Sequence, residues 1–433
     1  MQKNNLSKVT VSLPSTLTKI LEKINKNGLG ILFVVNDEFK LIGSISDGDI
    51  RRDFLKKKNH KDVITEKSSI INKNPISLLS TCDVSKIQET LNKEVDQKIV
   101  RCIPLVDQEN RIVDYSTRDR ARKFSILEPT IGKEELFNVI DAIKSGWISS
   151  KGAYLSKFEN SFSSYLKGGF SVAVSSGTTA LQIALVALGV KSGDEVIVPS
   201  LSFVATASTV CHAGATPVFA DVKSMDDWTI DPEDIERKIT SKTKAIVAMH
   251  YGGYGADMER ICEIAQKHGL YVVGDACHAP LGERNGQKLG SFGDIACYSF
   301  YSNKNISTGE GGMLITNSDE FAEKARVLRT HGMTTTAFDR VNGKAFYDVV
   351  DVGYNYRMDD IRSAIGIAQF AKLEAALEKR EKVAQLYRQL LKDCKFIQIP
   401  FSEYSGRSSN HVFGIYVEEN ADGLKKVLKD AEI

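Results

Sequence analysis

Apolar runs and polar turns alternate along the first part of the chain, and the same order occurs twice. The segment "ILFVVNDEFKLIGSISDGDIRRDFLKK" predicts a strand, a turn, a second strand and a helix that begins near Asp47. The later segment "CIPLVDQENRIVDYSTRDRARKF" repeats that order, and each copy follows a helical stretch, "STLTKILEKINKN" or "VSKIQETLNKEV". Internal similarity of this kind predicts two copies of one α+β unit. We therefore expect a first domain over residues 1–125.

The pattern then changes to nearly continuous apolar strands that alternate with amphipathic helices. The predicted strands are "EVIVPSL", "TPVFADV", "KAIVAMHY", "LYVVGDA", "DIACYSFY" and "GGMLIT". Such runs are typical of strands buried on both faces, so we expect an α/β domain with a mainly parallel sheet covered by helices over residues 126–380. From Arg357 an apolar stripe predicts one or two long helices, and residues 381–433 indicate the start of a small C-terminal α+β domain.

The composition narrows the class of protein. A chain of 433 residues is too long for one ordinary hydrophobic core, so we expect two or more domains. The 57 basic and 55 acidic residues give a net charge of +2, and there is no long basic run. This balance argues against nucleic acid or an anionic membrane as the main partner. The seven cysteines are scattered and never spaced CxxC, which argues against a disulfide framework and a metal site. With no signal-peptide pattern and no membrane-spanning run, we expect a cytoplasmic protein.

Ligands of parallel sheets gather at the carboxyl ends of the strands, so the residues directly after each apolar run are the candidates for a site. In "VAVSSGTTALQIALVAL" a strand runs into Ser-Ser-Gly-Thr-Thr and a helix begins at once. Free N–H groups and the helix dipole suit a phosphate there. Gly177 permits close approach, and Thr178 and Thr179 offer hydroxyls. Since Ser and Thr also cap helices, this stretch alone leaves phosphate binding and capping both open.

Two further runs end in ionisable residues. Asp275 ends "LYVVGD" and His278 follows it. The carboxylate of Asp275 either pairs with a cation or a hydrogen-bond donor, or caps a helix. Ser299 and Lys304 follow "DIACYSF", ahead of a glycine-rich loop. A lysine in a desolvated pocket has the lowered pKa that an imine-forming nucleophile needs, whereas a surface lysine would lay its stem on apolar residues. A phosphate cradle, a strand-end aspartate and a buried lysine together match the needs of pyridoxal 5′-phosphate (PLP).

Residues from about 128 onward resemble the DegT/DnrJ/EryC1/StrS family of PLP-dependent sugar aminotransferases. The matching blocks are "SGWISSKGAYLSKFE", "SSGTTALQIALVALGVKSGDEVIVPSLSFVATA", "GDACHAPLG", "GSFGDIACYSFYSNKNISTGEGGM" and "GYNYRMDDIRSAIGIAQ". The resemblance implies an aspartate aminotransferase-like, fold type I domain. It also implies that the family continues beyond the last residue, so we expect the small domain to be incomplete.

The resemblance assigns roles to individual residues. Lys304 is implied to hold the coenzyme aldehyde and to move the proton, and Asp275 to pair with the pyridine nitrogen. The other implied coenzyme contacts are Gly177, Thr178, Thr179 and Ser299 at the phosphate, Phe203 stacked on the ring, His278 beside it, and Asn355 reaching the phosphate of a neighbouring subunit in a homodimer. The implied substrate contacts are Trp147, Ser149, Tyr154 and His331.

The implied reaction is transfer of an amino group from L-glutamate, through PLP and pyridoxamine phosphate, to a keto-deoxy sugar on a nucleoside diphosphate. Its product would serve surface-glycan synthesis. Related sugar dehydratases carry histidine in place of the lysine, so Lys304 favours transamination. A dehydratase and a nucleotide-sensing protein without activity are the alternatives. The choice among GDP, UDP and dTDP, and the sugar carbon that is aminated, stay open.

The doubled N-terminal pattern resembles a tandem pair of CBS domains. The residues that carry this resemblance are Ser46 and Asp49 in "GSISDGDIRR", and Ser116 and Asp119 in "DYSTRDRARK". In that family a Ser or Thr followed three residues later by Asp can hold the ribose and phosphate of an adenine nucleotide. The same residues are also good helix caps, and the sequence leaves both interpretations open.

Overall fold

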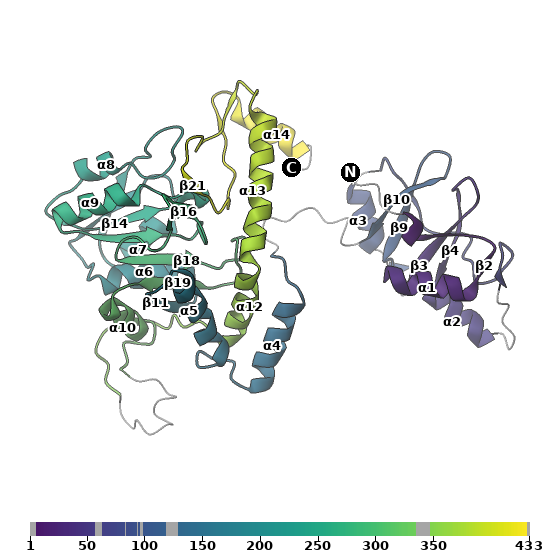
Figure 1. Cartoon of the computed structure of the whole chain (residues 1–433), viewed down its shortest axis with the longest axis horizontal. Coiled ribbons are helices and arrows are strands. Elements are labelled where there is room, and N and C mark those ends of the chain that lie inside the picture. The colour runs from purple at the N-terminus through teal and green to yellow at the C-terminus, as the bar shows by residue number, and fades with distance from the viewer. Residues whose placement is uncertain are drawn as a thin grey trace. The chain divides into compact units, whose positions relative to one another are not determined.

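The computed structural model describes residues 6–56, 63–82, 84–92, 94–95, 98–117, 129–334 and 347–430. Contacts divide the chain into two compact units, Met1–Ser125 and Ile126–Ile433 (Figure 1). Among these described residues no helix is long and apolar enough to cross a membrane.

The first unit contains the predicted repeat. Each copy is a three-stranded sheet in which a short strand lies parallel to the central strand and the third strand lies antiparallel to it. The strands of the first copy are β1 (Thr10–Ser12), β3 (Ile31–Val35) and β4 (Leu41–Ser46), and those of the second are β6 (Leu78–Leu79), β9 (Cys102–Val106) and β10 (Ile112–Thr117). The helices are α1 (Leu17–Asn27), α2 (Asp47–Lys56) and α3 (Val84–Asn92), with the short elements η1 (Leu6–Lys8), β2 (Ser15–Thr16), β5 (Val63–Ile64), β7 (Glu94–Val95) and β8 (Lys98–Ile99).

The two copies are joined through the turns between their paired strands. The N–H of Leu41 donates to the carbonyl of Asn110 at 2.9 Å, and the N–H of Ile112 donates to the carbonyl of Phe39 at 3.1 Å. Apolar residues of both copies, among them Phe33 and Val106, form one buried cluster at this junction. The copies therefore share a core and fold as one unit.

The second unit is built on a seven-stranded sheet in the order β11-β19-β18-β15-β14-β12-β13. Only β19 runs antiparallel to its neighbours; the remaining pairs are parallel. The bounds are β11 (Phe170–Val174), β12 (Glu195–Pro199), β13 (Thr216–Ala220), β14 (Thr243–Met249), β15 (Tyr271–Asp275), β18 (Ile295–Ser299) and β19 (Gly312–Thr316). The predicted mainly parallel sheet is confirmed.

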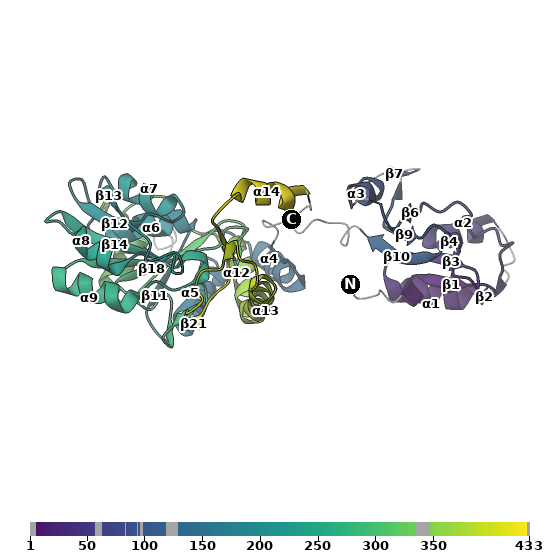
Figure 2. The same cartoon turned by 90° about the horizontal axis from the view of Figure 1, so that it is seen from above.

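Helices cover both faces of this sheet (Figures 1 and 2). The helices of the second unit are α4 (Lys133–Ser145), α5 (Ala153–Tyr165), α6 (Gly177–Ala187), α7 (Ala205–His212), α8 (Pro232–Arg237), α9 (Met258–His268), α10 (Asp319–Leu328), α12 (Asp360–Ala371), α13 (Leu373–Leu391) and α14 (Ala421–Asp430). Short elements complete the unit: η2 (Tyr251–Gly253), β16 (Glu283–Arg284), β17 (Gln287–Lys288), β20 (Ile397–Gln398), β21 (Gly406–Arg407) and β22 (Tyr416–Val417). Because β16 pairs with β21, the C-terminal segment is attached to the large domain.

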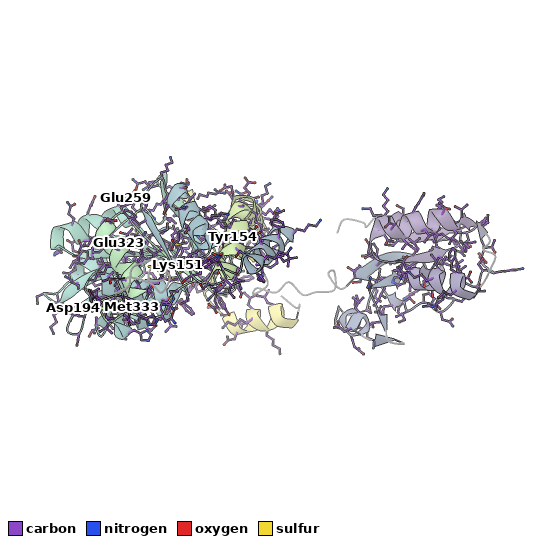
Figure 3. All side chains as sticks on the ribbon, turned by 90° about the horizontal axis from the view of Figure 1, so that it is seen from below. Lys151, Tyr154, Asp194, Glu259, Glu323 and Met333 are labelled. Carbon is purple, nitrogen blue, oxygen red and sulfur yellow. The ribbon has the colours of Figure 1, made fainter. Side chains whose placement is uncertain are left out.

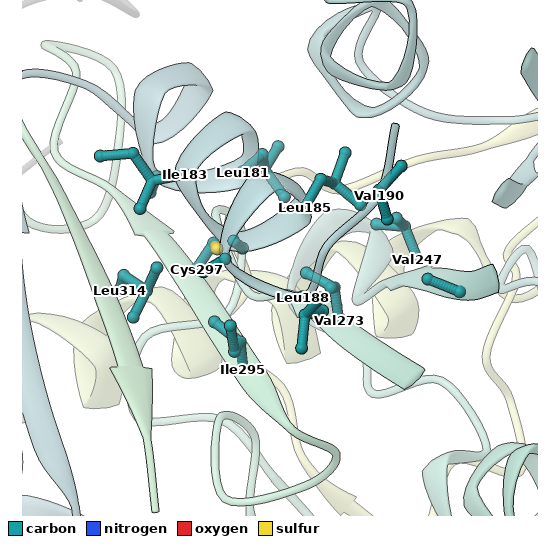
Figure 4. Packing of buried hydrophobic residues seen from close by; sticks show 14 of the residues in the cluster. Leu181, Ile183, Leu185, Leu188, Val190, Val247, Val273, Ile295, Cys297 and Leu314 are labelled. Carbon is teal, nitrogen blue, oxygen red and sulfur yellow. The ribbon is translucent and has the colours of Figure 1, made fainter. Parts of the chain in front are cut away.

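Successive residues of each central strand enter different cores, as a side-chain period of two requires. Val273 packs in the cluster beneath α6, together with Leu181 and Leu185 (Figure 4), whereas its neighbour Val272 packs with Ile261 of α9. The strands are thus apolar on both faces. The apolar pattern stops at their carboxyl ends, where polar residues such as Asp275 and Ser299 lie.

Candidate active site

The ends of β15 and β18 and the start of α6 converge on one place. Asp275 ends β15 and Ser299 ends β18, and these two strands are parallel neighbours. A Cβ atom added to Gly177, the first residue of α6, would lie 2.6 Å from Cβ of Ser299 and 3.0 Å from Sγ of Cys277. Only glycine allows this approach, so the start of α6 packs directly on the end of β18; the predicted approach of Gly177 to a phosphate stays a prediction.

Asp275 is held rigidly at the carboxyl end of the sheet. Its side chain is 2% exposed, Oδ2 accepts a hydrogen bond from Oγ1 of Thr206 at 2.8 Å, and Oδ1 accepts one from the N–H of Cys277 at 3.2 Å. Thr206 comes from the first turn of α7, so a helix on one face of the sheet fixes the carboxylate. A buried carboxylate with two donors keeps a defined orientation toward the site.

Lys304 lies in the compact loop after β18. Its N–H donates to the carbonyl of Tyr301 at 2.9 Å, and Thr308 closes the loop through a 2.9 Å bond to the carbonyl of Phe300. Burial lowers the pKa of the Lys304 amine, and the nearby Cys277 and Asp275 oppose that shift. Within the described part of the chain, no hydrogen-bond or ion-pair partner holds the Lys304 amine. The amine is therefore desolvated and uncommitted.

The start of α6 is closed by a reciprocal helix cap, which leaves two of its N–H groups without acceptors among the described residues. Oγ of Ser176 accepts from the N–H of Thr179 at 3.1 Å, and Oγ1 of Thr179 accepts from the N–H of Ser176 at 3.0 Å. This reciprocal cap occupies the Thr179 hydroxyl. For the N–H groups of Gly177 and Thr178, the described residues supply no acceptor. Two N–H groups at the positive end of the helix dipole therefore remain for a phosphate.

Two histidine rings border the lysine. The ring centroids of His278 and His411 are 4.4 Å apart, and the N–H of Gly252 donates to Nδ1 of His278 at 3.4 Å. Burial, followed by Lys304 and His411, lowers the pKa of His278 to about 2; burial, followed by Lys304 and Arg380, lowers the pKa of His411 to about 3. Both rings are thus neutral at physiological pH.

His411 and Cys277 are site residues that the sequence analysis did not name. His411 is brought in by backbone contacts, because its N–H donates to the carbonyl of Gly252 at 2.9 Å and its Nδ1 lies 3.1 Å from Oδ1 of Asn305. No local pattern marks it. Cys277 stands between two residues that were named, and its position within "DACHA" was the available signal.

The remaining predicted site residues take different positions. Phe203 precedes α7 and is 63% exposed, and Asn355 is exposed and pairs with Thr330 in an antiparallel bridge. Trp147, Ser149 and His331 are also exposed. Tyr154 is buried, and its hydroxyl donates to Oδ2 of Asp141 in α4 at 2.9 Å. None of the contacts around Lys304 described above involves these residues, so their substrate and partner roles stay predictions.

In the first unit, Ser46 and Asp49 cap α2. Oγ of Ser46 donates to Oδ2 of Asp49 at 2.6 Å, the N–H of Asp49 donates to Oγ of Ser46 at 3.2 Å, and Arg52 pairs with the same carboxylate. These are the hydrogen bonds of a helix cap, the second of the two roles that the sequence left open for Ser46 and Asp49. Ser116 is buried in β10, and Asp119 lies outside the described residues.

A seven-stranded, mainly parallel sheet with an uncommitted lysine, a fixed carboxylate and an anion cradle at its carboxyl end defines a fold type I PLP enzyme. Residues 129–433 match the DegT/DnrJ/EryC1/StrS aminotransferase family, and residues 5–56 match the CBS domain. The spore coat polysaccharide biosynthesis protein SpsC of Bacillus subtilis (strain 168) is 39% identical over 324 residues, 74% of this chain and 80% of the relative. A GDP-perosamine synthase of Vibrio cholerae is 36% identical over 318 residues, 71% of this chain and 82% of the relative.

Solved structures agree with these relatives. The PLP form of the putative sugar aminotransferase Spr1654 from Streptococcus pneumoniae has a TM-score of 0.66 and 28% identity, covering 71% of this chain and 82% of that one. The chain belongs to the DegT/DnrJ/EryC1/StrS aminotransferase family, whose cofactor is PLP. The predicted family, fold class and cofactor are confirmed, and a CBS domain is confirmed at the N-terminus.

The site fits this cofactor. Because Gly177 has no side chain, the start of α6 lies against Ser299 at the end of β18, and within the described structure the N–H groups of Gly177 and Thr178 have no acceptor. These residues would hold the phosphate. Asp275 would face the pyridine nitrogen, and Lys304 would bond to the aldehyde carbon.

Proposed function

We propose that this protein transfers an amino group from L-glutamate to a keto-deoxy sugar linked to a nucleoside diphosphate, for the synthesis of surface-glycan amino sugars. The relatives support this substrate class, since one is named for polysaccharide biosynthesis and another for GDP-perosamine synthesis. The observation that carries the proposal is the buried, uncommitted amine of Lys304 close enough to Asp275 for the carboxylate to affect its pKa.

Lys304 and Asp275 would have different roles in the reaction. When bound, PLP supplies an aldehyde that captures amines and a ring that accepts the electron pair released at the neighbouring carbon. The lowered pKa of Lys304 increases its neutral fraction, so the amine can act as nucleophile and then move a proton at the donor or sugar carbon. Asp275, oriented by Thr206, would stabilise positive charge at the ring nitrogen.

The neutral rings of His278 and His411 border the amine without adding a second cation. Such a border keeps water away from Lys304 and helps to maintain its lowered pKa. Phe203, exposed in the single chain, would stack on the ring of the coenzyme.

The active form would be a cytoplasmic homodimer in which each chain's Asn355 reaches the coenzyme phosphate of the other. Asn355 is exposed in the single chain and is therefore accessible to a second copy. The first unit would bind an adenine nucleotide near Ser46 and Asp49. Calorimetric titration of ATP or AMP into the wild type and into Asp49→Ala tests that binding.

The reaction is tested on the whole protein loaded with PLP. Borohydride reduction followed by peptide mapping should label Lys304, and L-glutamate should bleach the yellow form. A panel of GDP-, UDP- and dTDP-linked 3-keto and 4-keto sugars should then restore the colour and yield an amino sugar. A label on another residue, or a deoxy product without nitrogen, would overturn the proposal in favour of an inert protein or a dehydratase, respectively.

A further inference from the structure

A basic cavity of about 180 Å³ lies where the loop before α5, the end of α10 and Arg357 meet. Four basic side chains line it, Lys151, Arg326, Arg329 and Arg357, against one acidic side chain, Glu323. Figure 3 labels Lys151 and Glu323 in this region of the second unit. We call it the arginine cavity.

Two of the three arginines already have partners inside the protein. Arg326 pairs with Glu323 one helical turn earlier. Nη1 of Arg329 donates to Oε1 of Glu159 at 2.9 Å and to the carbonyl of Ala173 at 2.6 Å. These contacts fix both guanidinium groups at the wall of the cavity.

Other donors in the arginine cavity remain without acceptors. Nε of Arg329 is buried and unpaired. Over the described ranges, no hydrogen bond or ion pair engages the half-buried guanidinium of Arg357. Ser150 and Thr330 add hydroxyls to the lining. A buried donor without an acceptor is costly, so Nε of Arg329, together with the uncommitted guanidinium of Arg357, favours an anion that comes from outside the chain.

Size and geometry indicate which anion fits. Sites for drug-sized molecules typically have volumes of roughly 300–1,000 Å³, so this cavity of about 180 Å³ suits a small group rather than a whole nucleotide. Guanidinium groups bind phosphate oxygens in pairs, whereas none of the described residues that line the cavity is aromatic and could stack on a base. A phosphate or diphosphate is therefore the ligand class.

The arginine cavity is connected to the coenzyme site through the backbone. Arg357 forms an antiparallel bridge with Val174, and the N–H of Ser175 donates to the carbonyl of Tyr356 at 2.9 Å. The chain then continues directly into Gly177 at the start of α6. His331, for which the family resemblance implies a substrate contact, lies between two lining residues, Arg329 and Met333.

We propose that the arginine cavity binds the diphosphate of the nucleotide-linked sugar, with Arg357 as its principal ligand and Arg326 and Arg329 as supporting ligands. This inference rests on the proposed function. It implies that the protein recognises the diphosphate independently of the base, so selectivity among nucleotides comes from residues outside this cavity.

The test uses the full-length, PLP-loaded protein and measures binding of UDP, GDP and inorganic pyrophosphate by calorimetry at low and high salt. Losing charge-assisted hydrogen bonds should weaken binding of all three probes about ten- to hundred-fold in Arg357→Gln. Arg326→Gln should weaken them less, because Glu323 already engages that side chain. The matched control is Lys324→Gln, on the same helix but outside the lining, and it should bind as the wild type does.

The outcomes separate this inference from the reaction. Equal affinity of wild type and Arg357→Gln for every probe, with both proteins folded by circular dichroism, overturns the cavity assignment. Loss of UDP and GDP binding but not of pyrophosphate binding overturns it as well, because the nucleoside would then be what is recognised. The wild type could fail to react with glutamate while Arg357→Gln still binds pyrophosphate more weakly than the wild type does. In that case the proposed function fails but the anion site stands.

Discussion

The hydroxyl of Thr206, in the first turn of α7, donates a 2.8 Å hydrogen bond to Oδ2 of Asp275 at the end of β15. Both side chains are buried, with Thr206 at 1% exposure and Asp275 at 2%. The bond ties a helix on one face of the sheet to the carboxylate that would face the coenzyme nitrogen. The orientation of that carboxylate therefore depends on a residue of a different element, the helix α7.

This bond predicts the effect of Thr206→Val. Valine keeps the shape but leaves Oδ2 of a buried carboxylate with one donor fewer, which costs about 1–3 kcal/mol. We expect PLP affinity to fall about ten-fold or more, as measured by absorbance titration of the apoprotein. Thr206→Ser restores the hydroxyl and should recover most of the affinity. Equal losses in the two variants would show that packing, and not the hydrogen bond, is what matters.

A second prediction concerns the space beside α6. In Gly177→Ala the new methyl group would stand 2.6 Å from Cβ of Ser299, so the helix start has to move and the phosphate cradle opens. We expect a stability loss of about 1–3 kcal/mol by urea unfolding, together with weaker PLP binding. Gly274→Ala is the control, since its methyl would meet nothing closer than 3.7 Å. Similar behaviour of the two variants would contradict the steric argument.

Much of this site could be predicted because the sheet determines where strand ends meet. The apolar runs before Asp275 and Lys304 identify buried parallel strands, and the carboxyl ends of neighbouring parallel strands lie at one edge. The same reasoning made Gly177 and Ser299 candidates for one site, and the family resemblance implied that both lie at the phosphate. Local pattern was sufficient wherever a residue directly follows a strand.

Residues positioned by long-range contacts could not be found in that way. His411 reaches His278 only because the backbone of its segment pairs with Gly252 and Gly253. The sequence around Tyr154 fits a ring that faces a substrate as well as one that faces another helix. The structure shows that its hydroxyl donates a hydrogen bond to Asp141 of α4. The arginine cavity joins three segments that are distant in sequence, and so no single motif indicates it.

The charges around Lys304 lead to a prediction about its titration. Burial lowers the pKa of this amine, whereas Asp275 raises it. Asp275→Asn removes a negative charge, so the pKa of Lys304 should fall further and the neutral amine should appear at lower pH. The measurement is the pH dependence of Lys304 modification by an amine reagent in the apoprotein, followed by peptide mapping. Glu320→Gln, an exposed acid on α10, should leave the curve in place; a shift to higher pH in Asp275→Asn would contradict the argument.

The amine itself should be indispensable for turnover. Lys304→Gln keeps a polar side chain of similar reach but can neither bond to the aldehyde nor move a proton, and proton transfer by a positioned group typically contributes about 10²–10⁴-fold. We expect at least that loss in the rate of the glutamate half-reaction, measured by stopped-flow absorbance. Lys304→Arg retains the charge and should be equally impaired. Substantial activity in either variant would remove Lys304 from the chemistry.

The last prediction concerns His250, which is fully buried and whose pKa burial and then Arg284 lower to about 3. The unfolded chain binds a proton near pH 6.5, while the folded chain binds one only near pH 3. Since the unfolded state binds more protons between these values, stability should fall as the pH drops through this window, by about 1.4 kcal/mol per pH unit for this one histidine.

His250→Asn tests this prediction, because the asparagine oxygen can still accept the 3.2 Å hydrogen bond that the N–H of Ala256 donates to Nδ1. The variant should lose stability less steeply than the wild type between pH 6.5 and pH 4, as measured by urea unfolding of the apoprotein at each pH. His212→Gln, at an exposed site on α7, should follow the wild-type slope. If His250→Asn also follows that slope, the burial of the His250 ring does not determine the acid sensitivity of this fold.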